Sequence, residues 1–224
     1  MIIFSKALAD QATVWDAIRA AEEVGVGRPV PDDMIRFSGQ TKPVVMWNIT
    51  RHCNLACEHC YIDATAAAAE ELRLEEGIRL IDELADLGIP MLILTGGEPL
   101  LSRNFYAYAF HAKEVGLRTV ISTNGTLITP EAARLLKEAE IRYVGVSLDS
   151  CRPKVHDRFR GVEGAYARAV DGLKNARDAG LKTGLRVTLT KDNWYEIPAL
   201  LDLTLEMKIP RFCLYHLVPV GRGA

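Results

Sequence analysis

The chain has 224 residues, which is enough for one large domain with a substantial hydrophobic core. About half of its residues are apolar and a quarter are charged, and the formal net charge of -2 offers no basic surface to nucleic acid or another polyanion. The first 23 residues include acids and bases and contain no apolar run long enough for a signal peptide or a membrane span. We therefore expect a cytoplasmic globular protein with no nucleic-acid or membrane partner.

The predicted elements begin with an amphipathic helix at about Thr13 to Val24, which a connection rich in glycine and proline, "GVGRPVPDD", separates from the rest of the chain. From Thr41 onward the pattern becomes regular. We therefore divide the chain into a helical extension with a linker, residues 1–40, and a core domain, residues 41–224.

In the core domain, apolar runs of strand length alternate with stretches of helical length. Strands that are apolar throughout predict a parallel sheet covered by helices on at least one face. Six strands linked by five helices fit a wound α/β sheet or most of a β/α barrel. The predicted strands are 43–50, 90–95, 118–123, 142–149, 184–190 and 212–218, and the predicted helices are 70–88, 105–115, 130–139, 165–179 and 197–207. In the first helix, the residues expected on the buried side are Leu72, Ile78, Ile81, Leu84 and Leu87.

Polar residues and glycines gather at the ends of four of these strands, in the stretches "RHCNLACEHC", "GGEP", "TNGT" and "SLDS". The carboxyl ends of parallel strands meet at one edge of a sheet, where separate loops converge on an active site. We therefore expect all four stretches to contribute to a single site.

Three of the five cysteines, Cys53, Cys57 and Cys60, form a C-x3-C-x2-C pattern after the first predicted strand. An odd number of unevenly clustered cysteines does not indicate a disulfide framework, so reduced thiols that bind a metal are the better interpretation. One alternative is a structural zinc site, with His52, His59 or a distant cysteine as the fourth ligand. The other is a cubane iron–sulfur cluster with one open iron, to which a small molecule binds through its own oxygen and nitrogen atoms.

The stretches "CNLACEHCY", "LTGGEPLL", "STNGT" and "VSLDS" together resemble the radical S-adenosylmethionine (radical SAM) enzymes, over about residues 43 to 220. The resemblance implies an α/β fold, a partial (β/α)6 TIM-like barrel of parallel strands. It also implies a [4Fe-4S] cluster at which S-adenosylmethionine is reductively cleaved to methionine and a 5'-deoxyadenosyl radical. The electron would come from a low-potential donor such as ferredoxin or flavodoxin.

The resemblance assigns the role of cluster ligands to Cys53, Cys57 and Cys60. It implies that His59, before the third cysteine, stacks on the adenine ring of the cofactor, and that Tyr61 shares this role. An exposed loop histidine and a tyrosine that caps the core are the alternatives for these two positions.

The "GGEP" stretch resembles the segment whose backbone receives the amino group of the cofactor's methionine end. Glycine allows a backbone to approach a ligand closely, which fits Gly96 and Gly97. Glu98 offers a carboxylate to the same ammonium group. A plain strand-to-helix turn is the alternative interpretation of this stretch.

Asn124, Ser147 and Asp149 match family positions that contact the ribose hydroxyls and the carboxylate of the cofactor. Their amide, hydroxyl and carboxylate groups suit such partners, although asparagine and aspartate also favour turns. Arg160, and Arg186 inside the fifth predicted strand, are candidate partners for a carboxylate, because an arginine in an apolar strand needs a partner.

The terminal stretch "LYHLVPVGRGA" and the stretch "KPVVMWNITRHCNLACEHCY" resemble the subgroup of NirJ-, AhbC- and AhbD-like proteins. This implies a sirohaem-derived tetrapyrrole substrate in haem or haem d1 biosynthesis, with Tyr215 and His216 as candidate substrate contacts. A peptide-modifying or sulfatase-maturing radical enzyme is one alternative, and a zinc-stabilised binding domain without chemistry is another.

Members of this subgroup continue into a cysteine-rich C-terminal domain, termed SPASM or twitch, which holds auxiliary iron–sulfur clusters. The present chain ends at Ala224, directly after the sixth predicted strand. We therefore expect the chain to be truncated before such a domain, with an auxiliary [4Fe-4S] cluster in the missing region. A protein that lacks auxiliary clusters is the alternative.

Overall fold

The computed structural model describes residues 2–3, 42–66 and 71–224, so the helix predicted at Thr13 to Val24 lies outside the described residues. The described residues form a seven-stranded sheet in the order β1-β7-β6-β5-β4-β3-β2. The neighbours from β2 to β7 pair in parallel, and the short β1 pairs antiparallel with β7. The strands are β1 Ile2–Ile3, β2 Val45–Asn48, β3 Leu92–Thr95, β4 Thr119–Thr123, β5 Val144–Ser147, β6 Thr183–Leu189 and β7 Phe212–His216.

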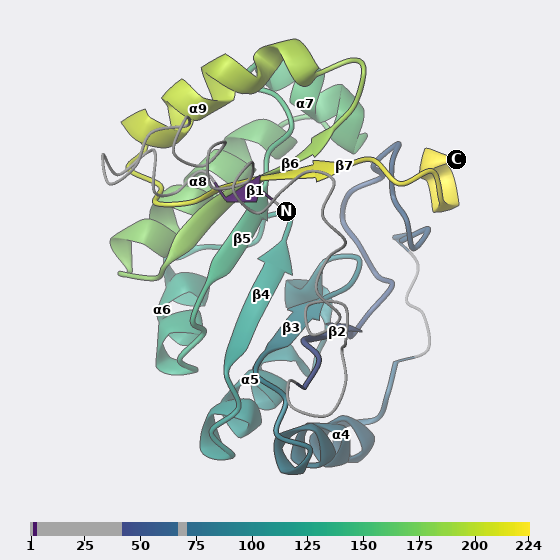
Figure 1. The fold of residues 1–224 in the computed structure, drawn as a ribbon, viewed down its shortest axis with the longest axis vertical. Helices are drawn as coiled ribbons and strands as arrows, with labels where there is room; N and C mark the ends of the chain where they lie inside the picture. Colours follow the sequence, from purple (N-terminus) through teal and green to yellow (C-terminus); the bar gives the residue numbers. More distant parts are fainter. Residues whose placement is uncertain (1, 4–41, 67–70) are drawn as a thin grey trace, which may run out of the picture.

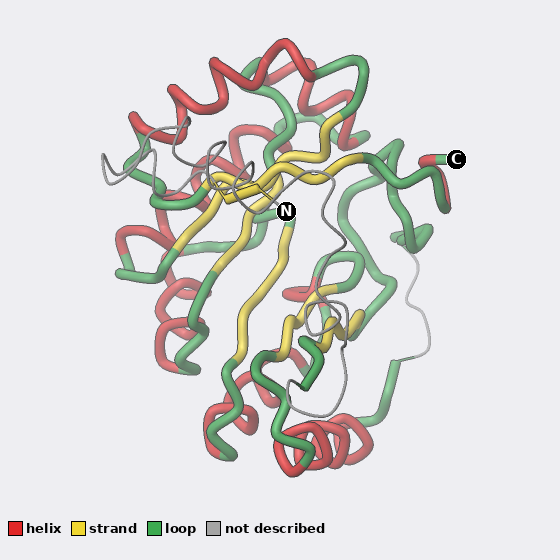
Figure 2. Tube along the Cα trace, in the orientation of Figure 1, coloured by secondary structure: helices red, strands yellow, loops and turns green. Residues whose placement is uncertain are grey.

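The sheet curls into a half-barrel with the helices along its outer side (Figure 1, Figure 2), which confirms the partial barrel of parallel strands. At least one α-helix connects each pair of consecutive parallel strands, as the alternation in the sequence predicts. The α-helices are α4 Leu74–Asp86, α5 Phe105–Glu114, α6 Pro130–Glu138, α7 Pro153–Arg160, α8 Ala165–Asp178 and α9 Ile197–Glu206. Short 3-10 helices are η1 Pro99–Leu101, η2 Trp194–Glu196 and η3 Gly221–Gly223. Among the described residues, every helix is too short or too polar to cross a membrane.

Helix α7 was not predicted from the sequence, because the stretch "PKVHDRFR" lacks the apolar periodicity that marks an amphipathic helix. Pro153 starts it with a fixed φ that suits the first helical turn. Gly161 ends it in the left-handed conformation, with a φ of 72°. Only His156 and Arg160 of this helix are buried, so the helix packs mainly through polar side chains.

Two further predictions differ from the structure in detail. Leu72 precedes α4 and Leu87 follows it, and both are exposed, so the buried side of this helix is shorter than the sequence pattern indicates. Strand β2 is half exposed and alternates, with Met46 on the exposed side at 52 %. Among the described strands it lies at the edge of the sheet and pairs on one side only, with β3.

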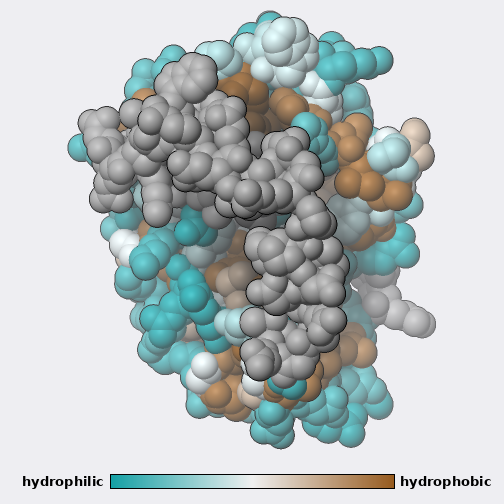
Figure 3. Space-filling view, in the orientation of Figure 1, coloured by the Kyte–Doolittle hydropathy of each residue, from teal (hydrophilic) through white to brown (hydrophobic). Residues whose placement is uncertain are grey.

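The main core lies between the sheet and the surrounding helices. Its largest fully buried side chains include Ile81, Phe105, Tyr108, Leu136, Leu173, Leu200 and Phe212. Apolar side chains are also exposed beside the carboxyl end of β7, where Leu217, Val218 and Val220 follow the strand (Figure 3). This exposed group lies next to the carboxyl ends of β5 and β6, because it lines a cavity together with Ser147, Arg186 and Thr188.

Candidate active site

The cysteine loop, which we define as residues 51–65, follows β2 and faces the carboxyl ends of the parallel strands. Backbone hydrogen bonds close it on itself, because Cys53 N donates to Thr65 O at 2.8 Å and Thr65 N donates to Arg51 O at 3.1 Å. Its buried side chains pack against Ala165 of α8 in a small apolar cluster separate from the main core. Since this cluster is small, the shape of the loop depends on hydrogen bonds from its neighbours.

A cavity of about 160 Å³, here called the cysteine cavity, lies between this loop and the carboxyl ends of β3 to β6. It brings together most of the predicted site residues from separate segments of the chain. Those that line it are Cys53, Cys57, Cys60, His59, Tyr61, Gly96, Gly97, Asn124, Ser147, Arg160 and Arg186. Glu98 and Asp149 are not among the lining residues and lie behind it.

Each cysteine sulfur is approached by an N–H donor. Leu55 N lies 3.4 Å from Cys53 Sγ, Ala64 N lies 3.3 Å from Cys60 Sγ, and Arg160 Nη1 lies 3.5 Å from Cys57 Sγ. Burial raises the pKa of the Cys53 thiol to about 11, and a bound metal cation would favour its thiolate. Among the described residues, no three His, Cys, Asp or Glu groups converge closely enough to hold one metal ion. Three sulfurs spread around one cavity fit a cubane cluster, in which each sulfur binds a different iron.

The glycines of "GGEP" pack against the backbone where the cysteine loop begins, at Thr50 and His52. A Cβ at Gly96, whose φ is 149°, would lie 2.4 Å from Thr50 O, and a Cβ at Gly97 would lie 2.4 Å from His52 O. The same backbones are joined by hydrogen bonds, from Gly97 N to Thr50 O at 2.8 Å and from Glu98 N to His52 O at 2.9 Å. The glycines therefore allow the end of β3 to approach the loop as well as the cavity.

Asn124, directly after β4, ties this strand to the cysteine loop. Its Nδ2 donates to Asn54 Oδ1 at 2.9 Å and lies 4.0 Å from Cys53 Sγ. Its Oδ1 accepts from Thr126 N at 2.9 Å, which fixes the orientation of the amide, and Asn54 Nδ2 donates to Thr126 Oγ1 at 2.8 Å. Asn124 thus lines the cavity with its side chain already engaged in a network.

Glu98 differs from the expectation that its carboxylate faces the cofactor. The side chain is fully buried and turns toward the end of β4, where it accepts from Thr123 Oγ1 at 2.7 Å and from Asn124 N at 2.8 Å. It also accepts from Leu100 N at 3.2 Å at the start of η1. Burial raises the pKa of this carboxyl to about 7 in spite of these donors. The structure therefore makes Glu98 a brace between the ends of β3 and β4.

Asp149 likewise supports a neighbour and does not line the cavity. It is buried and pairs with two nitrogens of Arg160, of which Nε donates to Asp149 Oδ2 at 2.8 Å, while Thr188 N donates to Oδ1 at 2.8 Å. Burial would raise the pKa of Asp149, but the Arg160 guanidinium and nearby histidines outweigh it and lower the pKa. Arg160 O also accepts from Ala56 N at 3.0 Å, so α7 holds both the sulfur of Cys57 and the backbone of its loop.

His59 presents a neutral ring to the cavity. The ring stacks on Phe159 of α7, with centroids 4.3 Å apart, and its Nδ1 is buried without a hydrogen-bond partner among the described residues. Burial and the nearby Arg160 lower its pKa to about 4. Tyr61 is half exposed and donates to Asn48 Oδ1 at 2.9 Å.

A second cavity of about 340 Å³, here called the apolar cavity, adjoins the first. Both are lined by His59, Tyr61, Ser147, Arg186 and Thr188. The remaining lining residues of the apolar cavity are Tyr215, His216, Leu217, Val218 and Val220. Of these described lining residues, none is an Asp, Glu or Lys, so the cavity offers one guanidinium in apolar surroundings.

Arg186 lies on the wall that the two cavities share. Its guanidinium lies over the ring of Tyr215, 4.6 Å from the centroid, and its Nη1 donates to Ser122 Oγ. Its Nε is buried without a hydrogen-bond partner among the described residues. Ser147 is its register neighbour on β5. This arginine therefore has a donor to spare for an anionic group in either cavity.

Arg222 of η3 is a site residue that the sequence analysis missed. It lines the cysteine cavity and donates to Cys57 O and to Ala64 O, each at 2.9 Å. The glycine on either side of this arginine after the last strand, in "GRG", was the available signal, because it indicates a close backbone approach.

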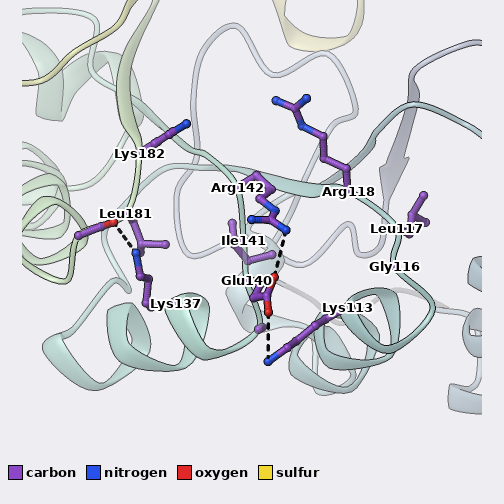
Figure 4. A pocket seen from close by; sticks show the side chains of 12 residues that line it. Lys113, Gly116, Leu117, Arg118, Lys137, Glu140, Ile141, Arg142, Leu181 and Lys182 are labelled. Carbon is purple, nitrogen blue, oxygen red and sulfur yellow. Dashed lines mark hydrogen bonds and ion pairs between the residues drawn. The ribbon is translucent and has the colours of Figure 1, made fainter.

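A larger hollow, of about 640 Å³, lies at the opposite end of the sheet and carries five lysines and arginines (Figure 4). Helices α5, α6 and α8 end there, and Lys113 Nζ donates to Glu138 O at 2.9 Å while Lys137 Nζ donates to Gly180 O at 2.7 Å. Lysines at helix carboxyl ends satisfy free carbonyls and complement the helix dipole. The two lysines are thus accounted for by the helix ends, and Arg142 forms an ion pair with Glu140 at 3.1 Å.

Comparisons with known proteins agree with this geometry. Residues 47–204 match the family model described as the radical SAM superfamily. The chain is 47% identical to a Fe-coproporphyrin III synthase of Methanosarcina barkeri over 100% of the chain and 55% of the relative. It is 39% identical to a pre-heme d1 synthase of Dinoroseobacter shibae over 87% of the chain and 48% of the relative, so it spans about half the length of these curated relatives.

The fold is also similar to a solved structure. The crystal structure of Streptococcus suis SuiB bound to S-adenosylmethionine gives a TM-score of 0.70 at 23% identity, over 79% of this chain and 41% of that one. The family match covers more than half of the chain and includes the cysteine loop and all three strand ends that contribute the "GGEP", "TNGT" and "SLDS" stretches. The chain belongs to the radical SAM superfamily of enzymes.

Proposed function

We propose that Cys53, Cys57 and Cys60 bind three irons of a [4Fe-4S] cluster and that the enzyme abstracts hydrogen from a tetrapyrrole side chain. Family membership supports an iron–sulfur cluster and S-adenosylmethionine as cofactors. When bound, these groups supply reductive cleavage of a carbon–sulfur bond and a 5'-deoxyadenosyl radical. The observation that carries the proposal is that the three sulfurs line one cavity with the carboxyl ends of four neighbouring strands.

The residues of this cavity would orient S-adenosylmethionine by complementary chemistry. His59 offers a neutral ring face to adenine, with Phe159 packed behind it. Asn124 and Ser147 offer an amide and a hydroxyl to the ribose. Arg186 has a spare donor for a carboxylate.

The backbone around Gly96 and Gly97 would receive the ammonium group of the cofactor through its carbonyl oxygens. Arg160 has a different role, because its guanidinium is engaged by Asp149 and by the sulfur of Cys57. It therefore orients a cluster ligand. Glu98 acts from behind the cavity by fixing the end of β4.

The tetrapyrrole assignment has two supports. The two relatives reported above are named for haem-related products, and the chain is 47% and 39% identical to them. The apolar cavity adjoins the cysteine cavity and combines aromatic and aliphatic side chains with the single guanidinium of Arg186. A flat apolar ring with carboxylate side chains matches this combination in polarity and charge.

The oxygen sensitivity of an open cluster calls for a reducing compartment, so we place the enzyme in the cytoplasm. A low-potential donor such as ferredoxin or flavodoxin would supply the electron, and an auxiliary [4Fe-4S] cluster would belong to a cysteine-rich region beyond Ala224.

The test of radical generation uses anaerobic reconstitution of the chain with iron and sulfide. The expected results are the absorbance and electron paramagnetic resonance of a [4Fe-4S] cluster and release of 5'-deoxyadenosine with strong reductant. Replacing Cys53, Cys57 and Cys60 together by alanine should abolish both, whereas Cys213→Ala, in buried β7, should retain the cluster. Stoichiometric zinc without iron after anaerobic purification would instead support a zinc-stabilised domain.

The test of substrate class is a titration of the reconstituted enzyme with a sirohaem-derived tetrapyrrole, an iron coproporphyrin and a candidate peptide. We expect a shift of the porphyrin absorbance for the tetrapyrroles and no binding of the peptide. Saturable peptide binding with no porphyrin binding would replace the tetrapyrrole by a peptide substrate, while leaving the cluster proposal intact.

A further inference from the structure

The segment after β7 connects the two cavities, from Leu217 to Gly223. Its first part, with Val218 and Val220, lines the apolar cavity, and Leu217 N donates to Leu189 O at 3.2 Å. Its last part, η3, lies on the cysteine loop. A segment that lacks strand partners over most of its length needs specific contacts to take this path.

Those contacts come from Arg222. Its backbone N donates to Cys60 O at 3.0 Å, its Nε donates to Cys57 O at 2.9 Å, and its Nη1 donates to Ala64 O at 2.9 Å. One residue therefore satisfies three backbone carbonyls of the cysteine loop, two of which belong to the proposed cluster ligands. Arginine suits this arrangement because the nitrogens of its planar guanidinium donate at fixed, separate positions, whereas the ammonium of lysine donates from one nitrogen.

The neighbouring glycine shows that this close approach is built into the chain. Gly221 has a φ of 59°, and a Cβ there would lie 2.4 Å from Cys60 O. Any other residue at 221 would have to move the arginine away from the loop. The same pattern of a glycine that lets a segment touch the loop occurs at Gly97 and at Gly161.

Arg222 also brings a positive charge to the cysteines. It lines the cysteine cavity together with Arg160, so two guanidinium groups lie at the loop that carries three thiols. The charge of Arg160 is already balanced by its ion pair with Asp149, so Arg222 adds the positive charge that would favour a more negative, reduced state of a bound cluster.

We propose that Arg222 is a positioning residue, which fixes the backbone of the cysteine loop and raises the reduction potential of the cluster bound there. The inference rests on the proposed function for the cluster, but its first part concerns the loop of the metal-free chain. Arg222 acts through the Cys57, Cys60 and Ala64 carbonyls and touches no reacting atom.

The first experiment measures amide hydrogen exchange of residues 53–65 in the metal-free full chain. Arg222→Gln should speed exchange in this loop by about tenfold, the loss expected for two hydrogen bonds from a partly exposed charged donor. The matched control is Arg168→Gln, because Arg168 is an exposed arginine that donates to one carbonyl, Glu163 O, at 3.3 Å. Equal exchange in the wild type and Arg222→Gln would overturn the positioning role.

The second experiment measures the midpoint potential of the reconstituted cluster. Arg222→Gln removes a cation and should lower the midpoint potential. Arg222→Lys keeps the charge, so its midpoint potential should stay near that of the wild type even if the amides of its cysteine loop exchange faster. Equal potentials for wild type and Arg222→Gln would overturn the electrostatic role. Failure of the wild type itself to take up iron would count against the proposed function, independently of the exchange result.

Discussion

The replacement Glu98→Gln tests whether the brace between β3 and β4 carries an unfavourable buried charge. Glu98 is fully buried, and its pKa is raised from 4.5 to about 7. Because the folded chain binds the proton more tightly than the unfolded chain, the contribution of Glu98 to stability is fully present below about pH 4.5 and is lost as the pH rises through about 7.

The two pKa values give the size of the effect. One pKa unit corresponds to about 1.4 kcal/mol, so the difference between the unfolded and folded pKa values of Glu98 corresponds to about 3 kcal/mol in the free energy of unfolding. Between about pH 5.5 and about pH 8 the contribution of Glu98 to the free energy of unfolding should fall by about 2 kcal/mol. Glutamine cannot ionise, so its contribution to stability does not change over this pH range. Its amide NH2 must face the N–H donor of Asn124 or of Leu100, which should cost about 1–3 kcal/mol at every pH.

The assay is urea unfolding of the metal-free chain at both pH values under reducing, anaerobic conditions. Burial lowers the pKa of His59 and of His156 to about 4, and these two groups gain stability as the pH rises through their unfolded values, with the opposite sign. The quantity to compare is therefore the difference between variant and wild type. That difference should shift by about 2 kcal/mol in favour of Glu98→Gln between the two pH values. It should not shift for Glu83→Gln, on the exposed side of α4, and a constant difference for Glu98→Gln would refute the reasoning.

Two further replacements test the contacts that hold the loop. Gly97→Ala places a methyl group 2.4 Å from His52 O, so it should lower the free energy of unfolding by about 1–3 kcal/mol and reduce iron uptake. In Gly88→Ala the added methyl group meets nothing within 4 Å, so only the left-handed φ at this position should lower the free energy of unfolding. This control should keep full iron uptake in the same urea and iron assays. Asp149→Asn leaves the buried Arg160 without its carboxylate and should destabilise the chain by about 3–5 kcal/mol in urea unfolding, and an unchanged midpoint would contradict the brace assigned to Asp149.

The order of strands and most helices was predictable because the apolar runs of β3 to β7 are long, and they alternate with helices whose amphipathic pattern is regular. Helix α7 was not, since its buried residues are His156 and Arg160, which no hydrophobic period reveals. Leu72 was predicted on the buried side of α4, but the helix begins only at Leu74 and Leu72 is exposed. Apolar periodicity therefore placed the start of this helix too early in the chain.

The candidate site was predictable at the level of segments and less so at the level of side chains. The cysteine spacing and the position of the polar stretches at strand ends place most of the predicted residues around one cavity. Sequence alone did not reveal that Glu98 and Asp149 turn away from it, because a carboxylate suits an ammonium ligand as well as a buried network. Arg222 was missed because its partners are backbone carbonyls, which leave no trace in the residue types of the loop.

The supports of the cysteine loop explain how a short motif can be held by distant parts of the chain. Glu98 N donates to His52 O, and Arg160 O accepts from Ala56 N. Arg222 donates to three carbonyls of the loop, so segments after β3, in α7 and after β7 hold its backbone. Side chains such as Ala56 and Glu58 point outward and are exposed, so they contribute little to the placement of the loop. The three sulfurs are therefore positioned by backbone hydrogen bonds and close glycine contacts, and the exposed side chains between the cysteines take little part in their placement.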